Sequence, residues 1–381
     1  MRKKEKNWLI LTPEYPPTIG GVSDYSRNLS QALSKDSTQV AVLSSGYSKT
    51  FSDGKVTVKC CLGAFLPWDL FGAGSKALKN QKGSIIFLQW VPHGFGLKSI
   101  NVFFVFWLLF FIAHKRHPLF LMIHEPFLRF KPNIKIIIAS LVQRAMLFSL
   151  IAFSSRLFLG NPAWGKFIRR INLANKPMQH LPIPSNIPVA YLESLPIRKP
   201  KDGKKLIYTI CHFSTYGKQI ESELHKIIVD LFSKFTNVRI LLVGKGSEHF
   251  HEKMSTRHPS FSGKMESTGP VDHFTISGLL SQSDIAIHPL QEGISFRNTT
   301  VAAYLAHGVP IIGTLGEATD KLFTESNLSI LVPPGDVSKF VNAVGFLLEN
   351  PAERIQMSTR GLEFYSCHLD IKNTVSILAP L

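Results

Sequence analysis

Short apolar runs alternate with helical stretches in the second half of the chain, and this alternation constrains the fold more than any other feature. The runs are rich in β-branched residues and cover residues 206–211, 239–243, 285–289, 309–313 and 328–332. Short runs that are apolar throughout are typical of parallel strands buried on both faces. The first half shows the same alternation from residues 8–11 onward. We therefore predict an α/β fold with two doubly wound, Rossmann-like domains.

A proline-rich segment separates the two alternating halves, because four prolines fall between residues 183 and 200. We expect two domains, a linker and a C-terminal tail. The N-terminal domain covers residues 1–190, the linker 191–203, the C-terminal domain 204–365, and the tail 366–381 packs back on the first domain. Doubly wound sheets bind ligands at the carboxyl ends of their strands. The functional site is therefore expected in a cleft where the two domains face each other.

The net positive charge of the chain comes entirely from its first half. Residues 1–190 hold 24 Lys and Arg against 7 Asp and Glu, and the remainder holds 19 of each kind. Such a positive field can attract nucleic acid, anionic lipid or an anionic substrate. We exclude nucleic acid because the sequence contains no recognised nucleic-acid module. The four cysteines show no metal-ligand or Cys-x-x-Cys spacing, which favours a reducing, cytoplasmic location.

Two apolar segments of the first half allow three interpretations. Residues 100–113 are uncharged but shorter than the roughly 20 residues that a membrane-spanning helix needs. Residues 136–153 approach that length but carry Gln143 and Arg144 near their centre, where a charge costs about 3 kcal/mol in a bilayer. The sequence favours a buried or half-buried helix, then a helix lying on an anionic membrane surface, and last a spanning helix.

The residues after the predicted strand 285–289 carry the clearest chemistry. Glu292 and Arg297 lie in a loop that precedes a helix beginning near Asn298 or Thr299. Backbone amides and the positive end of a helix favour an anion such as a diphosphate, and Arg297 adds a fixed cation. Glu292 can accept hydrogen bonds from sugar hydroxyls. This loop is therefore a candidate site for a diphosphate and a sugar, and an ordinary exposed loop between a strand and a helix is the alternative.

Two motifs in this order resemble one family of enzymes. The stretch from Glu292 to Pro310, EGISFRNTTVAAYLAHGVP, looks like the donor-site block of retaining glycosyltransferase family 4, the glycosyl transferases group 1. Near the N-terminus, PEYPP followed by Gly20 and Gly21 resembles that family's glycine loop, whose backbone amides would approach the donor phosphate. The resemblance implies the GT-B architecture, in which two Rossmann-like domains face each other across a cleft. It covers most of the chain and is weakest between residues 45 and 80.

The resemblance implies roles for the residues of the donor-site block. Glu292 would contact the donor sugar, and the amides of the following loop at Ser295 and Phe296 would hold the diphosphate with Arg297. Thr300 stands where the family usually has a second Glu that binds the ribose. The nucleotide base and the sugar are therefore left open.

Further donor-side candidates follow two other predicted strands of the second half. Lys218 follows the run 206–211, and the resemblance implies that it places its charge against the diphosphate. It also implies that the turn containing Gly244 and Gly246 lies beside the base. A solvated lysine and an ordinary tight turn are the structural alternatives.

The first domain contributes two histidines to the expected site. His124 directly follows a predicted strand over 119–123, so it should stand at the carboxyl edge of the sheet. The resemblance implies that it approaches the donor sugar and assists the reaction. His93 follows another strand and is placed on the acceptor side, with a loop-stabilising role as the alternative.

The mechanism that the resemblance implies is sugar transfer with retention of anomeric configuration, by front-face attack without a covalent nucleophile. Catalysis then depends on positioning and on stabilising charge on the leaving diphosphate. We expect no cofactor and no metal, since no Asp-x-Asp pair occurs. The acceptor is expected to be a glycan or a lipid-linked glycan, used at the inner face of a membrane. A nucleotide-sugar epimerase and a noncatalytic nucleotide-sugar binding protein are the alternatives.

Overall fold

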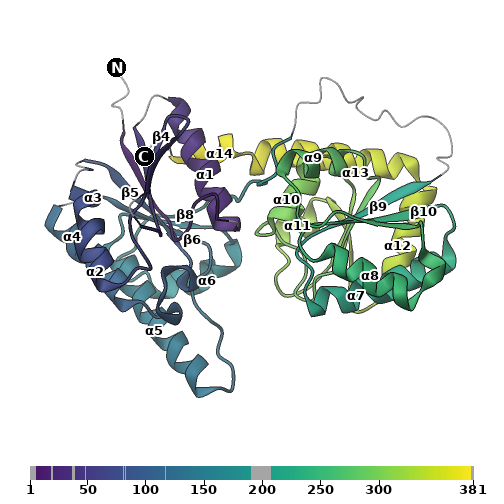
Figure 1. Cartoon of the computed structure of the whole chain (residues 1–381), viewed down its shortest axis with the longest axis horizontal. Coiled ribbons are helices and arrows are strands. Elements are labelled where there is room, and N and C mark those ends of the chain that lie inside the picture. The colour runs from purple at the N-terminus through teal and green to yellow at the C-terminus, as the bar shows by residue number, and fades with distance from the viewer. Residues whose placement is uncertain are drawn as a thin grey trace. The chain divides into compact units, whose positions relative to one another are not determined.

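Two sheets organise the chain, one in each of its two units (Figure 1). The computed structural model describes residues 6–378 apart from 19, 37–38, 48, 80, 82, 116 and 190–206. The N-terminal unit comprises Met1–Ile183 and Ile371–Leu381, and the C-terminal unit comprises Pro184–Asp370. The change of unit therefore lies near residue 183 rather than 190. The linker predicted over residues 191–203 lies outside the described residues.

The N-terminal sheet has the strand order β3-β4-β2-β1-β5-β6-β7-β8, and β3 alone runs antiparallel to its neighbour. Its strands are β1 (Trp8–Leu11), β2 (Val40–Ser44), β3 (Lys49–Asp53), β4 (Val56–Cys60), β5 (Ile85–Trp90), β6 (Leu119–Ile123), β7 (Arg156–Leu159) and β8 (Met178–His180). Trp8 at the start of β1 is in register with Val40 and Ile85. All four residues of β1 are buried, which explains why its sequence lacks polar alternation.

Helices cover both faces of this sheet. They are α1 (Gly21–Leu33), α2 (Pro67–Asp69), α3 (Ser75–Lys79), α4 (Val102–Lys115), α5 (Ile134–Phe153), α6 (Gly165–Ile171) and α14 (Ile371–Leu378), with the short turns η1 (Ser34–Asp36), η2 (Leu70–Gly74), η3 (Pro92–Phe95), η4 (Leu97–Ser99) and η5 (Pro162–Trp164). One core joins the sheet to α3, α4, α5 and α6, and the other joins it to α1 and α14. The last helix, α14, packs against α1, so the chain ends on the unit where it began.

The C-terminal sheet is entirely parallel, in the order β11-β10-β9-β12-β13-β14. Its strands are β9 (Tyr208–Phe213), β10 (Val238–Val243), β11 (Met265–Ser267), β12 (Ile285–His288), β13 (Ile311–Thr314) and β14 (Ser329–Val332). Each of the five predicted runs forms a strand. The sequence missed β11, an edge strand of three residues that is too short for periodicity to reveal.

The helices of the C-terminal unit lie on both faces of its sheet, as Figure 1 shows. They are α7 (Lys218–Lys234), α8 (Ser247–Arg257), α9 (His273–Ser281), α10 (Thr299–Ala306), α11 (Lys321–Glu325), α12 (Val337–Glu349) and α13 (Pro351–Phe364), with η6 (Pro259–Phe261) and η7 (Tyr365–Leu369). The strand order reverses between β9 and β12, which are hydrogen-bonded neighbours. This reversal creates the topological switch point where ligands of doubly wound folds bind. The predicted α/β class with two Rossmann-like units is confirmed.

Candidate active site

The loop between β12 and α10 carries Glu292 and Arg297, the residues on which the sequence prediction of a donor site mainly rests. Pro289 follows the last residue of β12, and Asn298 precedes α10, which begins at Thr299 within the expected range. Since β9 and β12 are neighbours, the loops after both strands lie at the same edge of the sheet. The fold therefore brings this loop to the switch point of the C-terminal unit.

Glu292 and Arg297 form an ion pair across the loop. The guanidinium Nη2 of Arg297 lies 2.7 Å from the Glu292 carboxylate. The Arg297 side chain is 32% exposed and the Glu292 side chain 66%. An exposed pair of this kind stabilises a protein by only about 0–1 kcal/mol, because water competes for both charges. Either partner can therefore exchange the other for a ligand group at little cost.

The backbone amides of the same loop are already bonded within the protein. Four amides are engaged in this way: Gly293 N with Leu290 O at 3.0 Å, Ile294 N with Thr314 O at 2.9 Å, Ser295 N with Asn298 Oδ1 at 2.8 Å, and Phe296 N with Asp320 Oδ2 at 2.9 Å. We expected the amides near Ser295 to face a diphosphate. In this structure they hold the loop in shape, so a phosphate would reach them only by displacing these partners.

Two of the predicted donor-binding side chains point into the protein. Ser295 is fully buried and donates its hydroxyl hydrogen bond to Asn298 Oδ1 at 3.1 Å. The Phe296 ring stacks on Phe364 with 5.0 Å between ring centres and packs against Phe323 at 4.8 Å. Both residues therefore shape the loop through its core. Thr300, in the first turn of α10, is half-buried.

Glycine is required at one position of this loop. Gly293 has a φ of +87°, and a Cβ built on it would lie 2.4 Å from the backbone nitrogen of Gly316. The β12–α10 and β13–α11 loops thus approach each other more closely than any side chain allows. Glu292 O also accepts a hydrogen bond from Ala318 N at 2.8 Å. The neighbouring loop therefore fixes the backbone of Glu292.

Lys218 and the two predicted glycines lie at the same edge of the sheet. Lys218 is the exposed first residue of α7, where its ammonium can face an anion at the helix terminus. Gly244 has a φ of +111°, and a Cβ there would lie 2.3 Å from Ser214 O. Gly246 has a φ of +90° and precedes α8. Close approach of the β9–α7 and β10–α8 loops explains both glycines without a ligand.

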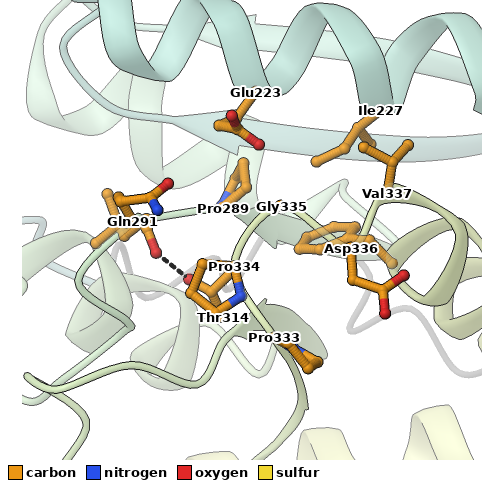
Figure 2. Close-up of a pocket in the computed structure, with 12 residues that line it drawn as sticks. Glu223, Ile227, Pro289, Gln291, Thr314, Pro333, Pro334, Gly335, Asp336 and Val337 are labelled. Carbon is orange, nitrogen blue, oxygen red and sulfur yellow. Dashed lines mark hydrogen bonds between the residues drawn. The ribbon is translucent and has the colours of Figure 1, made fainter.

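A hollow opens at this edge beside the loop (Figure 2). Glu223 and Ile227 reach it from α7, while Pro289 and Gln291 line it from the β12–α10 loop and residues 333–337 from the loop before α12. Water-sized molecules can occupy only about 10 Å³ of it, far below the roughly 300–1,000 Å³ of typical ligand sites. The hollow alone is therefore too small for a whole nucleotide-sugar.

Sequence reasoning missed a pair of histidines beneath the switch point. His212 of β9 and His288 of β12 are buried, and their rings lie 5.7 Å apart in a stacked arrangement. Burial lowers the pKa of His288 to about 4, and burial together with the neighbouring His288 lowers that of His212 as well. Tyr304 of α10 accepts a hydrogen bond from Phe213 N at 2.7 Å and so ties the motif helix to β9. A histidine near the end of each of two strands was the sequence signal that could have revealed this pair.

In the N-terminal unit, His124 follows β6 directly, as the sequence predicted. Its Nε2 lies 2.7 Å from Gln89 Oε1, and its ring stands edge-on to Tyr25 with 5.1 Å between ring centres. Burial lowers the pKa of His124 to about 4, although part of the residue still reaches solvent. Because a carbonyl oxygen only accepts, Nε2 carries the proton and Nδ1 keeps its lone pair.

The glycine loop is partly filled by a carboxylate that the sequence did not single out. A Cβ on Gly20 would lie 2.1 Å from Glu14 Oε1, whereas Gly21 has open space around it. Burial raises the pKa of Glu14, while a hydrogen bond from the Ser23 backbone and the charge of His93 oppose that shift. The start of α1, where we expected a phosphate, therefore already holds the carboxyl group of Glu14.

His93 lies in η3, after β5, and its Nδ1 is 3.5 Å from Glu125 Oε2. The hydrogen-bonded Glu125 raises the pKa of His93, against partial burial, which lowers it. Both side chains are more than half exposed. The ends of β1, β5 and β6 thus bring Glu14, His93 and Glu125 to one edge of the N-terminal sheet. Among the residues that the structure describes, no group of three or more His, Cys, Asp or Glu is arranged to hold a metal ion.

A family model and a curated protein each match part of this sequence. Residues 204–350 match the family model of the glycosyl transferases group 1. A phosphatidyl-myo-inositol mannosyltransferase of Mycobacterium leprae is 24% identical over 207 residues, which are 54% of this chain and 54% of that protein. The chain therefore matches about half the length of this curated relative.

Solved structures are similar over nearly the whole chain. Sucrose-phosphate synthase from Thermosynechococcus elongatus aligns with a TM-score of 0.72 at 13% identity, covering 98% of both chains. Anabaena Alr3699/HepE in complex with UDP and glucose aligns with a TM-score of 0.66 at 13% identity, covering 98% of this chain and 99% of that one. At such identities these similarities show the fold. The chain thus has the GT-B fold of two Rossmann-like units, and residues 204–350 of its C-terminal unit match the glycosyl transferases group 1 model.

Proposed function

We propose that this protein is a glycosyltransferase that moves a sugar from a nucleotide-sugar to a glycan or lipid-linked acceptor with retention of anomeric configuration. The observation that carries the proposal is the Glu292–Arg297 pair at the switch point of the C-terminal unit, inside the family-matched region. The similar Alr3699/HepE structure contains UDP and glucose, and the matched relative is named as a mannosyltransferase.

Donor binding exchanges the ion pair for ligand contacts. Arg297 turns its guanidinium from Glu292 to the diphosphate, and the released carboxylate accepts hydrogen bonds from sugar hydroxyls. Lys218 adds a second cation at the start of α7, where the helix terminus also favours negative charge. Four loop amides already have protein partners, so in this proposal the two side-chain cations provide most of the diphosphate binding.

The reaction proceeds on one face of the sugar. The acceptor hydroxyl attacks the anomeric carbon as the bond to the diphosphate breaks, and its proton passes to the departing diphosphate oxygen. Arg297 and Lys218 stabilise the charge that develops there, so no covalent nucleophile is needed. His124 offers its unprotonated Nδ1 to a sugar hydroxyl, because its low pKa keeps the imidazole neutral at pH 7.

The same cations make a metal unnecessary in this proposal. Activity should remain unchanged in excess EDTA, since Arg297 and Lys218 supply the positive charge that a divalent ion would otherwise bring. Loss of transfer in EDTA with recovery on adding manganese would contradict this part of the proposal and leave the sugar-transfer reaction itself untouched.

A nucleotide-sugar panel tests the activity itself. The chain is incubated with each candidate donor, with and without a crude lipid and glycan extract, and free nucleoside diphosphate is measured. We expect release that depends on the extract and is lost in Glu292→Ala. Conversion of the donor to an isomeric sugar without any acceptor would indicate an epimerase instead. Donor binding without turnover of any kind would indicate a noncatalytic binding protein.

We also propose a cytoplasmic location at the inner face of a membrane. The net positive charge of the N-terminal half supports this placement, because anionic lipid headgroups attract such a surface within about a Debye length. Fractionation of cells that produce the full chain checks it. Recovery in the cytoplasmic and inner-membrane fractions is the expected result, and recovery outside the cytoplasmic membrane would contradict it.

A further inference from the structure

The outer side of α5 is apolar along its whole length. Exposed residues recur at helical spacing, and Ile134, Ile138, Leu141 and Phe148 are each 42–68% exposed. A helix on the surface of a water-soluble protein normally turns polar side chains outward. Among the described residues, α5 is the helix long and apolar enough to span a membrane by composition, yet a third of its apolar window is buried inside the unit.

The adjacent helix α4 repeats this pattern. Val102, Phe103, Phe106 and Phe110 are 47–63% exposed, and the rings of Phe106 and Phe110 lie 6.4 Å apart. The two helices contact each other and cover the same side of the N-terminal sheet (Figure 1). Phe71 of η2 continues the surface, with its ring 6.4 Å from that of Phe106. We call the outward sides of α4 and α5 with Phe71 the aromatic face.

The polar residues in the middle of α5 do not interrupt the aromatic face. The Arg144 guanidinium lies 3.8 Å from the ring centre of Phe127 and 4.1 Å from that of Phe130, and it donates to Ser140 O at 3.1 Å. Gln143 is buried and donates to Ser99 O at 3.0 Å. Both residues are therefore held by the protein. The polar groups near the centre of this apolar run are thus satisfied within the N-terminal unit.

Packing of the inner side excludes a spanning orientation. Met146, Leu147, Leu150 and Ile151 of α5 are buried in one core with β6 and β7. A transmembrane position would pull these residues out of the core and expose the sheet. α5 can therefore reach lipid only with its outer side, lying parallel to the membrane surface.

Charge around the aromatic face favours anionic lipid over a protein partner. Residues 97–153 contain seven Lys and Arg and a single acidic residue, Glu125. Lys98, Lys131 and Lys135 are exposed at the ends of the two helices. Phenylalanines over an apolar surface with lysines at its borders match the chemistry of the headgroup region, where rings enter the acyl boundary and cations meet phosphates.

We propose that the aromatic face docks the protein on the surface of an anionic bilayer, with α4 and α5 lying in the headgroup region. The inference rests on the exposed side chains of the N-terminal unit and does not depend on donor chemistry. Where the proposed function also holds, docking brings a lipid-linked acceptor to the unit expected to recognise it.

The test is cosedimentation of the full chain with vesicles of phosphatidylcholine alone and with vesicles that also contain about 30% phosphatidylglycerol, whose negative surface attracts basic segments. We expect binding that prefers the anionic vesicles and weakens as salt rises. Phe106→Ser with Phe110→Ser should weaken it at least about tenfold, because two rings lose burial in the apolar boundary. Lys131→Glu with Lys135→Glu should abolish the preference for anionic vesicles.

A matched control is Phe274→Ser with Phe346→Ser, two comparably exposed rings of the C-terminal unit, which should bind like the unchanged chain. Circular dichroism and nucleoside diphosphate binding verify that each variant is folded. The proposal is overturned if the unchanged chain stays in the supernatant with anionic vesicles, or if the Phe106 and Phe110 variant binds as tightly as the control. A stable dimer that this variant dissociates, without vesicle binding, would assign the aromatic face to a second copy instead.

Discussion

Replacement of Arg297 by alanine tests how the donor loop binds an anion. In the free protein Arg297 is paired with Glu292 at 2.7 Å, and that exposed pair is worth about 0–1 kcal/mol. In the bound state its charge-assisted hydrogen bonds to a diphosphate would contribute about 1.5–3 kcal/mol. The difference leaves about 0.5–3 kcal/mol for binding, so Arg297→Ala should weaken the affinity for a nucleoside diphosphate by more than about twofold and by up to about 150-fold. The free energy of unfolding should change by less than about 1 kcal/mol.

Isothermal titration calorimetry with nucleoside diphosphates measures the effect, and chemical unfolding measures stability. The matched control is Arg360→Ala on α13, since Arg360 pairs with Glu353 at the same 2.7 Å with side chains 34% and 33% exposed. That variant should bind diphosphate normally. If Arg297→Ala binds within about twofold of the unchanged chain, the exchange of Glu292 for the diphosphate is the wrong description.

Three further results are expected. Phe296→Ala should lower the unfolding free energy by about 3–5 kcal/mol because its ring is stacked in the core, whereas Phe274→Ala, at an exposed position, should change it little in the same denaturant titration. Gly293→Ala should destabilise by about 1–3 kcal/mol through its positive φ and its clash with a backbone, whereas Gly278→Ala in α9, with open space around it, should be neutral or stabilising by calorimetry. The folded pKa of His288 lies below its unfolded value, so the stability it contributes is present above about pH 6.5 and is lost toward about pH 4. His288→Asn should therefore flatten the decline of the unfolding free energy across this pH range. An unchanged slope in unfolding titrations would contradict this role of His288.

Much of the fold followed from local sequence. The runs at β9 and β12 are mostly apolar because both faces of a parallel sheet are covered, and this pattern is visible without any long-range information. The place of His124 followed in the same way, since a residue directly after a parallel strand stands at the carboxyl edge. The position of the donor loop at the switch point depends on the pairing of β12 with β9, and the sequence did not predict that strand order.

The contacts inside the site depend on distant residues. Phe296 N donates a hydrogen bond to Asp320, which lies 24 residues further along the chain on another loop. No local sequence pattern predicts that contact. The direction of Arg144 depends in the same way on Phe127 and Phe130, whose rings fold back over α5. Glu14 occupies the glycine loop only because the turn after β1 brings its carboxylate against Gly20. Side-chain directions of this kind are set by tertiary packing rather than by periodicity.

The most direct test of the account is the anomeric configuration of the transferred sugar. Proton nuclear magnetic resonance of the purified product, compared with the nucleotide-sugar that the panel identifies, reports that configuration through the coupling of the anomeric proton. The account predicts the same configuration in product and donor, with product formation lost in Glu292→Ala. An inverted product, or full product formation by Glu292→Ala, would contradict the proposed site and its chemistry.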